Sequence, residues 1–282
     1  LDRSSAASDV YKRQKIGNDI LVENVKCLDL DLTLDCGQAF RWERCEDGSY
    51  CGVAMGHFLH IDSVDDGFVF YDTDEDTFYN VWVPYFDLEK DYDELCQRLR
   101  SDELLSSTID EYYGIRILNQ DSWEALCSFV ISQQNNIKRI KLIISRLCRA
   151  YGDEVCDGYF AFPSPERLSK LSVEDFEALG TGYRARYLYR LSQGVQNGEI
   201  DLDYIKSLPM ADAKKELLKI YGVGEKVASC VLLFGMQFYE CCPLDVWMKR
   251  VMKYYPDGFP ECFKGIEGIA QQYLFHWARN NL

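Results

Sequence analysis

The sequence predicts an α+β protein, with an N-terminal antiparallel, twisted β-sheet domain packed on a larger all-α domain. Short, partly alternating apolar segments fill residues 15–112 and are separated by turn signals such as EDGS and VDDG, which is typical of antiparallel strands. From Asp121 onward the apolar residues recur with the period of helices. With 282 residues the chain is long enough for two domains, which we expect at 15–115 and 116–282.

The individual elements follow from the same patterns. In the N-terminal part we expect strands at DILVENV (19–25), LDLDLTL (28–34), SYCGVAMGHFLHID (49–62) and DGFVFYDT (66–73), then helix over 87–114. In the C-terminal part we expect helices at 122–132, 137–152, 164–171, 172–179, 184–193, 211–221, 226–234, 244–255 and 265–278. The first fourteen residues, LDRSSAASDVYKRQ, fit no element and are similar to translated adapter sequence, so we expect a non-native or disordered leader at 1–14.

Cysteine is abundant, but its spacing does not indicate a metal. The chain has twelve cysteines without a C-x-x-C pair, and its three histidines are His57, His60 and His276. Neither zinc-site spacing nor the spacing of a four-cysteine iron–sulfur loop is present. We therefore expect no metal site, and cysteines that act as small buried side chains in a reducing, cytoplasmic location, nucleoid-associated in a prokaryote.

The net charge of −15 is unevenly distributed. Residues 43–111 hold 19 acidic and 4 basic side chains, which accounts for the whole net charge and leaves the rest of the chain neutral. Two other segments, 133–150 and 182–190, carry five and three Lys or Arg and no acid. Because binding of a polyanion depends on the local patch, nucleic acid is not excluded, and we expect the acidic block to face away from it.

The stretch YGVGEKVASCVLLFG (221–235) joins two predicted helices through Gly222 and Gly224. The glycines permit positive φ and remove side chains from the turn. The second helix then begins with unpaired backbone N–H groups, which can bind a phosphate. This hairpin is either an ordinary helix–helix turn or a grip on a DNA backbone.

Two side chains at helix starts are the candidate catalytic residues. Lys226 lies in the first turn of the second hairpin helix, where the positive end of the helix dipole favours a neutral amine that can form a Schiff base. The alternative is an exposed surface lysine. Asp245 begins the next helix, either as its N-cap or as a carboxylate aimed at a developing positive charge. Together they suit cleavage of a glycosidic bond through an oxocarbenium-like state.

These motifs resemble a known family. LPMADAKKELLKIYGVGEKVASC, followed by PLDVWMKR, resembles the helix-hairpin-helix DNA glycosylases with a Gly/Pro-rich loop and Asp, the HhH-GPD superfamily. The 8-oxoguanine DNA glycosylase/lyase branch is indicated by CGQAFRWE (36–43), SQQNNIKRI (132–140), LGTGYRARYL (179–188) and IAQQYLF (269–275). The resemblance covers residues 20–280 approximately, with the sheet as that branch's N-terminal domain and the helices as its HhH-GPD domain.

The resemblance implies a bifunctional DNA glycosylase/AP lyase that excises 8-oxoguanine opposite cytosine from duplex DNA in base excision repair. Lys226 would attack the sugar C1′ of a flipped-out nucleotide, and a Schiff base and β-elimination would follow, with Asp245 stabilising the cationic sugar. The resemblance assigns the carbonyl of Gly37 to the N7 hydrogen of 8-oxoguanine. It assigns the rest of the base pocket to Gln271 at the Watson–Crick edge and to Phe275 and Cys230 at the two faces.

The resemblance also implies the DNA-binding residues. Asn136 would fill the vacated stack, Tyr183 would wedge beside it, and Arg139 and Arg184 would hydrogen-bond the orphaned cytosine. The plain structural alternatives are an aromatic core residue for Phe275 and phosphate contacts or solvated faces for the arginines.

Two departures from the family pattern leave the finer DNA contacts open. Gln134 stands where an asparagine is usual, and Trp247 follows Asp245 where many relatives have a histidine. The implied partner is double-stranded DNA, and we expect a monomer that does not bind a membrane. No cofactor is required, but the carbonyls of the hairpin turn could bind a monovalent cation. The rival interpretations are a related glycosylase with another lesion preference and a non-catalytic DNA-binding module.

Overall fold

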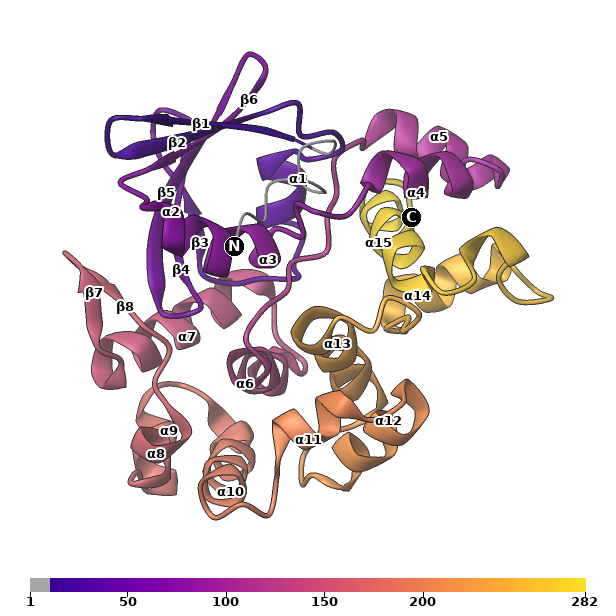
Figure 1. Cartoon of the computed structure of the whole chain (residues 1–282). Coiled ribbons are helices and arrows are strands. Elements are labelled where there is room, and N and C mark those ends of the chain that lie inside the picture. Colours follow the sequence, from indigo (N-terminus) through magenta and orange to yellow (C-terminus); the bar gives the residue numbers. More distant parts are fainter. Residues whose placement is uncertain (1–10) are drawn as a thin grey trace. The chain divides into compact units, whose positions relative to one another are not determined.

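The computed structural model describes residues 11–282 (Figure 1). The chain packs into two compact units. Unit 1 comprises the residues up to 52 together with 59–119 and 244–282, and unit 2 comprises 53–58 and 120–243. The C-terminal segment therefore shares a unit with most of the sheet, although the sequence placed it with the helical domain.

A twisted antiparallel sheet forms as the sequence predicts, but from six strands (Figure 1), of which β1 and β3 were not predicted. Their order is β1-β2-β6-β5-β4-β3. The strands are β1 (Lys12–Ile16), β2 (Asp19–Glu23), β3 (Trp42–Arg44), β4 (Tyr50–Ala54), β5 (His57–Val64) and β6 (Gly67–Tyr71). Met55 and Gly56 join β4 to β5 with φ of 53° and 76°, the positive values that a two-residue hairpin turn requires.

Alternation along the strands sets the two faces of the sheet. Ile20 and Val22 of β2 are fully buried, and so are Leu59 and Ile61 of β5, whereas the residues between them are less buried. Trp42 of β3 lies over Gly52, where a Cβ would come within 2.5 Å of the indole. The core face thus carries the alternating apolar residues, as expected for a sheet with one buried face.

The N-terminal region contains more helix than the sequence predicts. The segment LDLDLTL is not a strand but helix α1 (Leu30–Leu34). The Asp29 carboxylate accepts a 2.8 Å hydrogen bond from the Leu32 N–H, and Leu30, Thr33 and Leu34 are buried on one helical face, so the cap and the core override the alternating pattern. A further helical run, α2 (Glu75–Thr77), η2 (Phe78–Trp82) and α3 (Val83–Tyr85), was not predicted.

The N-terminal leader was also predicted too long. Strand β1 already begins at Lys12 and pairs with β2, so residues 12–14 are part of the sheet. The first ten residues of the expected leader lie outside the described residues.

The remaining helices of unit 1 come from both ends of the chain. They are α4 (Tyr92–Leu99), α5 (Glu103–Glu111), α14 (Val246–Val251), η4 (Met252–Tyr254), η5 (Glu261–Phe263) and α15 (Glu267–Asn281). In Figure 1, α15 packs beside α5 and α14. The single helix expected over 87–114 is two helices, because Asp91 and Asp102 each cap a separate one.

Unit 2 is mostly helical, as predicted. Its helices are α6 (Ser122–Ser132), α7 (Ile137–Tyr151), α8 (Pro165–Ser169), α9 (Val173–Ala178), η3 (Gly182–Arg184), α10 (Ala185–Gln196), α11 (Leu202–Ser207), α12 (Met210–Lys219) and α13 (Glu225–Met236). A small hairpin, β7 (Glu154–Cys156) and β8 (Tyr159–Phe160), interrupts the helices and was not predicted. The apolar helices α6 and α13 pack against each other at the centre of the unit. In residues 11–282 no helix combines the length and the hydropathy of a membrane span.

Candidate active site and DNA interface

Lys226 is held at the start of α13 by two groups from α6. Its Nζ lies 3.2 Å from Ser132 Oγ and 5.1 Å from the centre of the Phe129 ring. Because the Ser132 hydroxyl donates its proton to the Phe129 carbonyl at 2.8 Å, its oxygen accepts from the lysine. The Phe129 ring is stacked on Phe234 of α13. The amine is therefore half-buried, positioned and bordered on one side by apolar surface, unlike a solvated surface lysine.

The two glycines of the hairpin have different structural roles. Gly222 has a φ of +88°, and a Cβ there would lie 2.4 Å from the ring of Tyr187. Gly224 is the N-cap of α13; no side chain caps the helix, and a Cβ at this glycine would meet open space among the described residues. Gly222 is thus required by conformation and packing, whereas Gly224 leaves the N–H groups of the first turn accessible.

The SQQNN loop after α6 is fixed to the hairpin and to η3. The side chain of Gln133 donates to the Gly222 carbonyl at 3.0 Å. The backbone carbonyl of Gln133 accepts from Arg184 through both Nε, at 2.8 Å, and Nη2. Arg184 also donates to the Thr181 carbonyl at 3.1 Å and is only 5% exposed. Arg184 therefore holds the loop, a role that its sequence context did not predict.

The other predicted DNA-contacting residues lie around this loop and are exposed. Asn136 caps α7, with its side-chain oxygen accepting from the Arg139 N–H at 2.9 Å. Arg139 Nη2 reaches the Gly180 carbonyl at 3.3 Å. Gln134 has a φ of 50°, a backbone region that disfavours a side chain, and Tyr183 is 49% exposed. Cys230, which the sequence assigned to a face of the base, is buried within α13.

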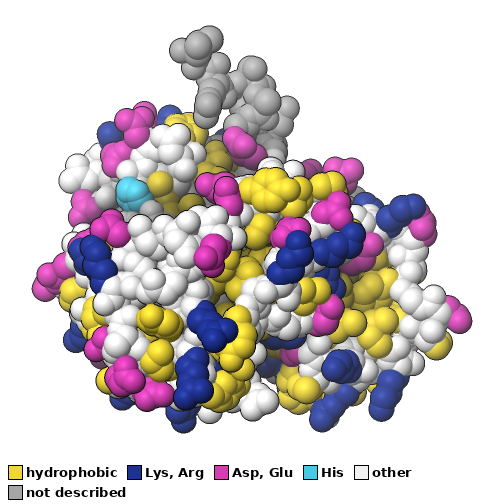
Figure 2. All heavy atoms as spheres, turned by 90° about the horizontal axis from the view of Figure 1, so that it is seen from below, with side chains coloured by type: hydrophobic (Ala, Val, Ile, Leu, Met, Phe, Trp, Pro, Cys, Tyr) yellow, Lys and Arg dark blue, Asp and Glu magenta, His cyan; other side chains and the backbone are white. Residues whose placement is uncertain are grey.

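Charge does not mark this region on its own. On the face shown in Figure 2, Lys and Arg side chains are interspersed with Asp and Glu. The acid-free segments predicted from the sequence fall on α7 and on η3 with the start of α10, in unit 2. Both acid-free segments thus lie beside the SQQNN loop or continue from it.

Asp245, in unit 1, is the N-cap of α14. Its Oδ1 accepts from the Trp247 N–H at 2.9 Å and from the Met248 N–H at 2.8 Å. Both capping bonds use Oδ1, so Oδ2 is not needed for the cap. The cap and the proposed electrostatic role are therefore compatible on one carboxylate.

Unit 1 also brings the CGQ segment close to α15. Gly37 has a φ of 90°, and Cys36 before it accepts a 3.4 Å hydrogen bond from Gln272 of α15. Gln38 after it is anchored by the carbonyls of Thr33 and Arg116, at 2.9 and 2.7 Å. Gly37 is thus held from both sides in a conformation that suits glycine.

The α15 residues assigned to the base differ in burial. Gln271 is 4% exposed, and its Oε1 has no hydrogen-bond partner among the described residues. A buried amide oxygen without a partner is costly and marks a position kept for a ligand or for function. Phe275 is half-buried, with the Arg279 guanidinium 5.6 Å from its ring centre.

Two protein-family models match consecutive segments of the chain. Residues 20–126 match the model described as the 8-oxoguanine DNA glycosylase N-terminal domain, and residues 127–256 match that of the HhH-GPD superfamily base excision DNA repair proteins. The chain belongs to the 8-oxoguanine glycosylase/lyase branch of the HhH-GPD superfamily. The resemblance inferred from its motifs is confirmed.

Individual relatives cover this chain to different extents. The 8-oxoguanine glycosylase/lyase of Clostridium acetobutylicum, solved with double-stranded DNA containing cytosine opposite 8-oxoguanine, is 39% identical with a TM-score of 0.89, over 96% of this chain and 98% of that one. The N-glycosylase/DNA lyase of Saccharomyces cerevisiae is 33% identical over 62% of this chain and 46% of its own length. The N-glycosylase/DNA lyase OGG1 of Arabidopsis thaliana is 30% identical over 82% of this chain and 67% of its own length. The chain thus spans nearly all of the clostridial enzyme but less than half of the yeast protein.

Proposed function

We propose that this chain is a bifunctional DNA glycosylase/AP lyase that excises 8-oxoguanine opposite cytosine from duplex DNA. Its family and its similarity to the clostridial enzyme support this. The observation that carries the proposal is the setting of Lys226, whose Nζ is held by Ser132 and Phe129 beside a helix terminus that is open to a phosphate.

The chemistry requires a neutral amine and a stabilised cation. Lys226 Nζ forms a bond to C1′ while the bond from C1′ to the base breaks and its electron pair leaves with the base. Loss of a proton from nitrogen and opening of the sugar give a Schiff base, and β-elimination then expels the 3′ phosphate. Asp245, with Oδ2 not used for the α14 cap, stabilises positive charge on the sugar.

Recognition of the damaged base is assigned to four residues. The Gly37 carbonyl accepts the N7 hydrogen that distinguishes 8-oxoguanine from guanine, and a mismatch there costs about 1–3 kcal/mol. Gln271 contributes its amide, whose buried Oε1 has no partner among the described residues, to the Watson–Crick edge, and Phe275 stacks on the base. Cys230 is assigned to the opposite face of the base.

The DNA duplex is assigned to the loop and the hairpin of unit 2. Asn136 and Tyr183 fill and wedge the vacated stack, and Arg139 contacts the orphaned cytosine. Arg184 keeps two of its five N–H groups for this cytosine while the others hold the loop. The interface also includes Gly222, Gly224 and the contacts of Gln134. The protein binds DNA as a monomer, and a monovalent cation can bind at the hairpin turn.

Borohydride trapping on an 8-oxoguanine:cytosine duplex tests the reaction. The wild type is expected to give a covalent protein–DNA adduct, and Lys226→Gln none. Lys215→Gln, which removes one positive charge from exposed α12 of the same hairpin, is the matched control and should trap like the wild type. Equal trapping by Lys226→Gln, or excision of an alkylated purine in preference to 8-oxoguanine, would overturn the proposal.

Asp245→Asn separates the two roles of this residue. Asparagine caps helices as well as aspartate does, so the variant should keep the wild-type melting temperature. The lost carboxylate charge should slow base release by about 10²–10³-fold, as for removal of one transition-state stabilising group. Full activity of a normally folded Asp245→Asn would reduce Asp245 to a structural cap.

A further inference from the structure

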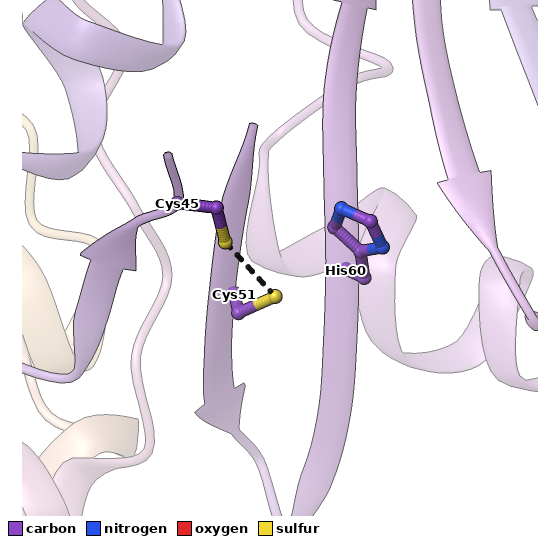
Figure 3. Close-up of side chains that lie close together, drawn as sticks. All are labelled: Cys45, Cys51 and His60. Carbon is purple, nitrogen blue, oxygen red and sulfur yellow. Dashed lines mark hydrogen bonds between the residues drawn. The ribbon is translucent and has the colours of Figure 1, made fainter. Parts of the chain in front are cut away.

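A cluster of metal-ligating side chains lies on the sheet, apart from the proposed catalytic groups. Cys45 follows β3, Cys51 lies on β4 and His60 on β5, and the two thiols point toward each other beside the imidazole (Figure 3). Their sulfur atoms are 3.4 Å apart. One donor atom from each of the three residues lies within 4.8 Å of the other two.

The backbone holds the three residues on the face of the sheet opposite the core. The Cys45 N–H donates to the Ser49 carbonyl at 2.8 Å, which closes the β3–β4 hairpin between the two cysteines. Trp42 and Leu59 point into the core, and alternation places Cys45, Cys51 and His60 on the other face. Cys45 and His60 are half-buried and the Cys51 thiol lies deeper, so an ion can approach from the side of Cys45 and His60 without unfolding of the sheet.

We propose that Cys45, Cys51 and His60 form a binding site for a soft divalent transition-metal ion, best suited to Zn²⁺. Two thiolates and one imidazole are a donor set that zinc prefers, and a water can take the fourth tetrahedral position. Zinc–sulfur bonds of about 2.3 Å require a separation between the sulfur atoms of about 3.8 Å, so the thiols need to move only a few tenths of an ångström. Each thiol releases its proton to solvent as its bond to the metal forms.

Hydrogen bonds hold the imidazole of His60 in place beside the thiols. Ser49 Oγ donates its only proton to Asp47 Oδ1 at 2.6 Å. His60 Nε2, 2.8 Å from the same oxygen, must therefore donate to it. The Asp47–Ser49 pair thus orients the ring, as outer-shell groups do in metal sites.

The charge of the surroundings also suits a cation. Glu43 pairs directly with Cys51 across β3 and β4, and Asp47 lies in the hairpin. The block 43–111 that contains the site carries the whole net charge of −15. A dication bound here reduces repulsion within that block, and it links three neighbouring strands.

Metal binding to the reduced, full-length wild type is tested first. Titration with Co²⁺ should give the thiolate-to-cobalt charge-transfer band and the visible bands of tetrahedral cobalt, and ZnCl₂ should abolish both at one ion per chain. Zn²⁺ should also protect Cys45 and Cys51 from alkylation in peptide mapping, while Cys156 and Cys262 react equally with and without metal. Absence of the cobalt bands, unprotected thiols, or a stable Cys45–Cys51 disulfide that does not bind Zn²⁺ would overturn the proposal.

Single variants then identify the ligands. Cys45→Ser, Cys51→Ser and His60→Gln should each weaken Zn²⁺ binding by more than about 100-fold, and Ser49→Ala by about tenfold, as expected for an orienting group. Cys156→Ser, a half-buried cysteine of unit 2, is the matched control and should bind like the wild type. Unchanged Zn²⁺ affinity in any of the three ligand variants, with a wild-type circular dichroism spectrum, would contradict the assignment of that residue.

Discussion

The hairpin glycines allow stability and DNA binding to be separated by two substitutions. Gly222→Ala places a methyl group 2.4 Å from the Tyr187 ring at a φ of +88°. The ring has little room to move, because Tyr183 and Tyr221 pack against it with centroid distances of 5.7 and 5.2 Å. The substitution therefore strains the backbone and overpacks the site at once.

The expected cost follows from these two effects. A left-handed conformation costs a residue with a Cβ about 1–2 kcal/mol, and overpacking typically adds about 1–3 kcal/mol. Gly222→Ala should therefore destabilise the protein by at least about 2 kcal/mol, which lowers the melting temperature by roughly 4–8 °C. Gly224→Ser is the matched variant: its side chain enters open space, and serine caps a helix about as well as glycine does, within a few tenths of a kcal/mol.

Two assays distinguish the variants. Thermal unfolding should show the loss only in Gly222→Ala. Fluorescence anisotropy with a duplex containing an uncleavable abasic analogue, at fixed salt, should show that Gly224→Ser binds about tenfold more weakly, a change of about 1.4 kcal/mol, because its side chain stands where a phosphate approaches. A wild-type melting temperature for Gly222→Ala would refute the packing argument, and wild-type DNA affinity for Gly224→Ser would refute the phosphate grip.

Four further outcomes are expected. Ser132→Ala removes the hydrogen-bond partner of Lys226, worth about 1 kcal/mol, so borohydride trapping should slow about fivefold with little change in DNA affinity; an unchanged rate would remove Ser132 from the site. Arg184→Lys cannot reproduce the forked contacts to the loop carbonyls, so the melting temperature should fall by roughly 2–8 °C, and retention of the wild-type value would show that the fork is dispensable. Gln271→Met removes a buried, partnerless oxygen, so the protein should be about 1 kcal/mol more stable in urea while 8-oxoguanine excision falls; lower stability would mean that the amide is satisfied in solution. Burial and the nearby Arg279 charge lower the pKa of His276 below its ordinary value of 6.5, so the unfolded state binds the proton more readily than the folded state. The free energy of unfolding should therefore be highest above about pH 6.5 and should decrease as the pH falls below it. In chemical unfolding, His276→Phe should show a smaller decrease between about pH 7 and pH 5.

Local sequence patterns predicted those helices and strands whose formation depends mainly on their own residues. The helical period after Asp121 predicted α6, α7 and α13 within a few residues, because each buries apolar residues that recur with that period. The GVG turn, Lys226 and Asp245 could be placed at helix starts for the same reason. The strand expected at 66–73 formed as β6, whereas the segment 49–62 formed two strands, β4 and β5, joined by the turn at Met55 and Gly56.

Where tertiary contacts compete with local pattern, the prediction from sequence was wrong. LDLDLTL alternates like a strand, but the Asp29 cap and the burial of Leu30, Thr33 and Leu34 select a helix. The aromatic run in α2, η2 and α3 has no clear helical period, and it forms because Phe78, Trp82 and Tyr85 pack with Trp42 and Phe70 in the core. Burial of a whole ring cluster outweighs local propensity.

The sequence by itself determined the family, the order of a sheet followed by helices, and the identity of the candidate catalytic lysine and aspartate, since these depend on contiguous motifs. Only the tertiary structure decided that Ser132 and Phe129 hold Lys226, that Arg184 holds the SQQNN loop, and that Gln271 Oε1 has no partner within residues 11–282. It also gathered two cysteines and a histidine from separate strands, although their spacing matches no metal motif. Sheet pairing and helix packing join residues that are distant in the chain, and no local period encodes that distance.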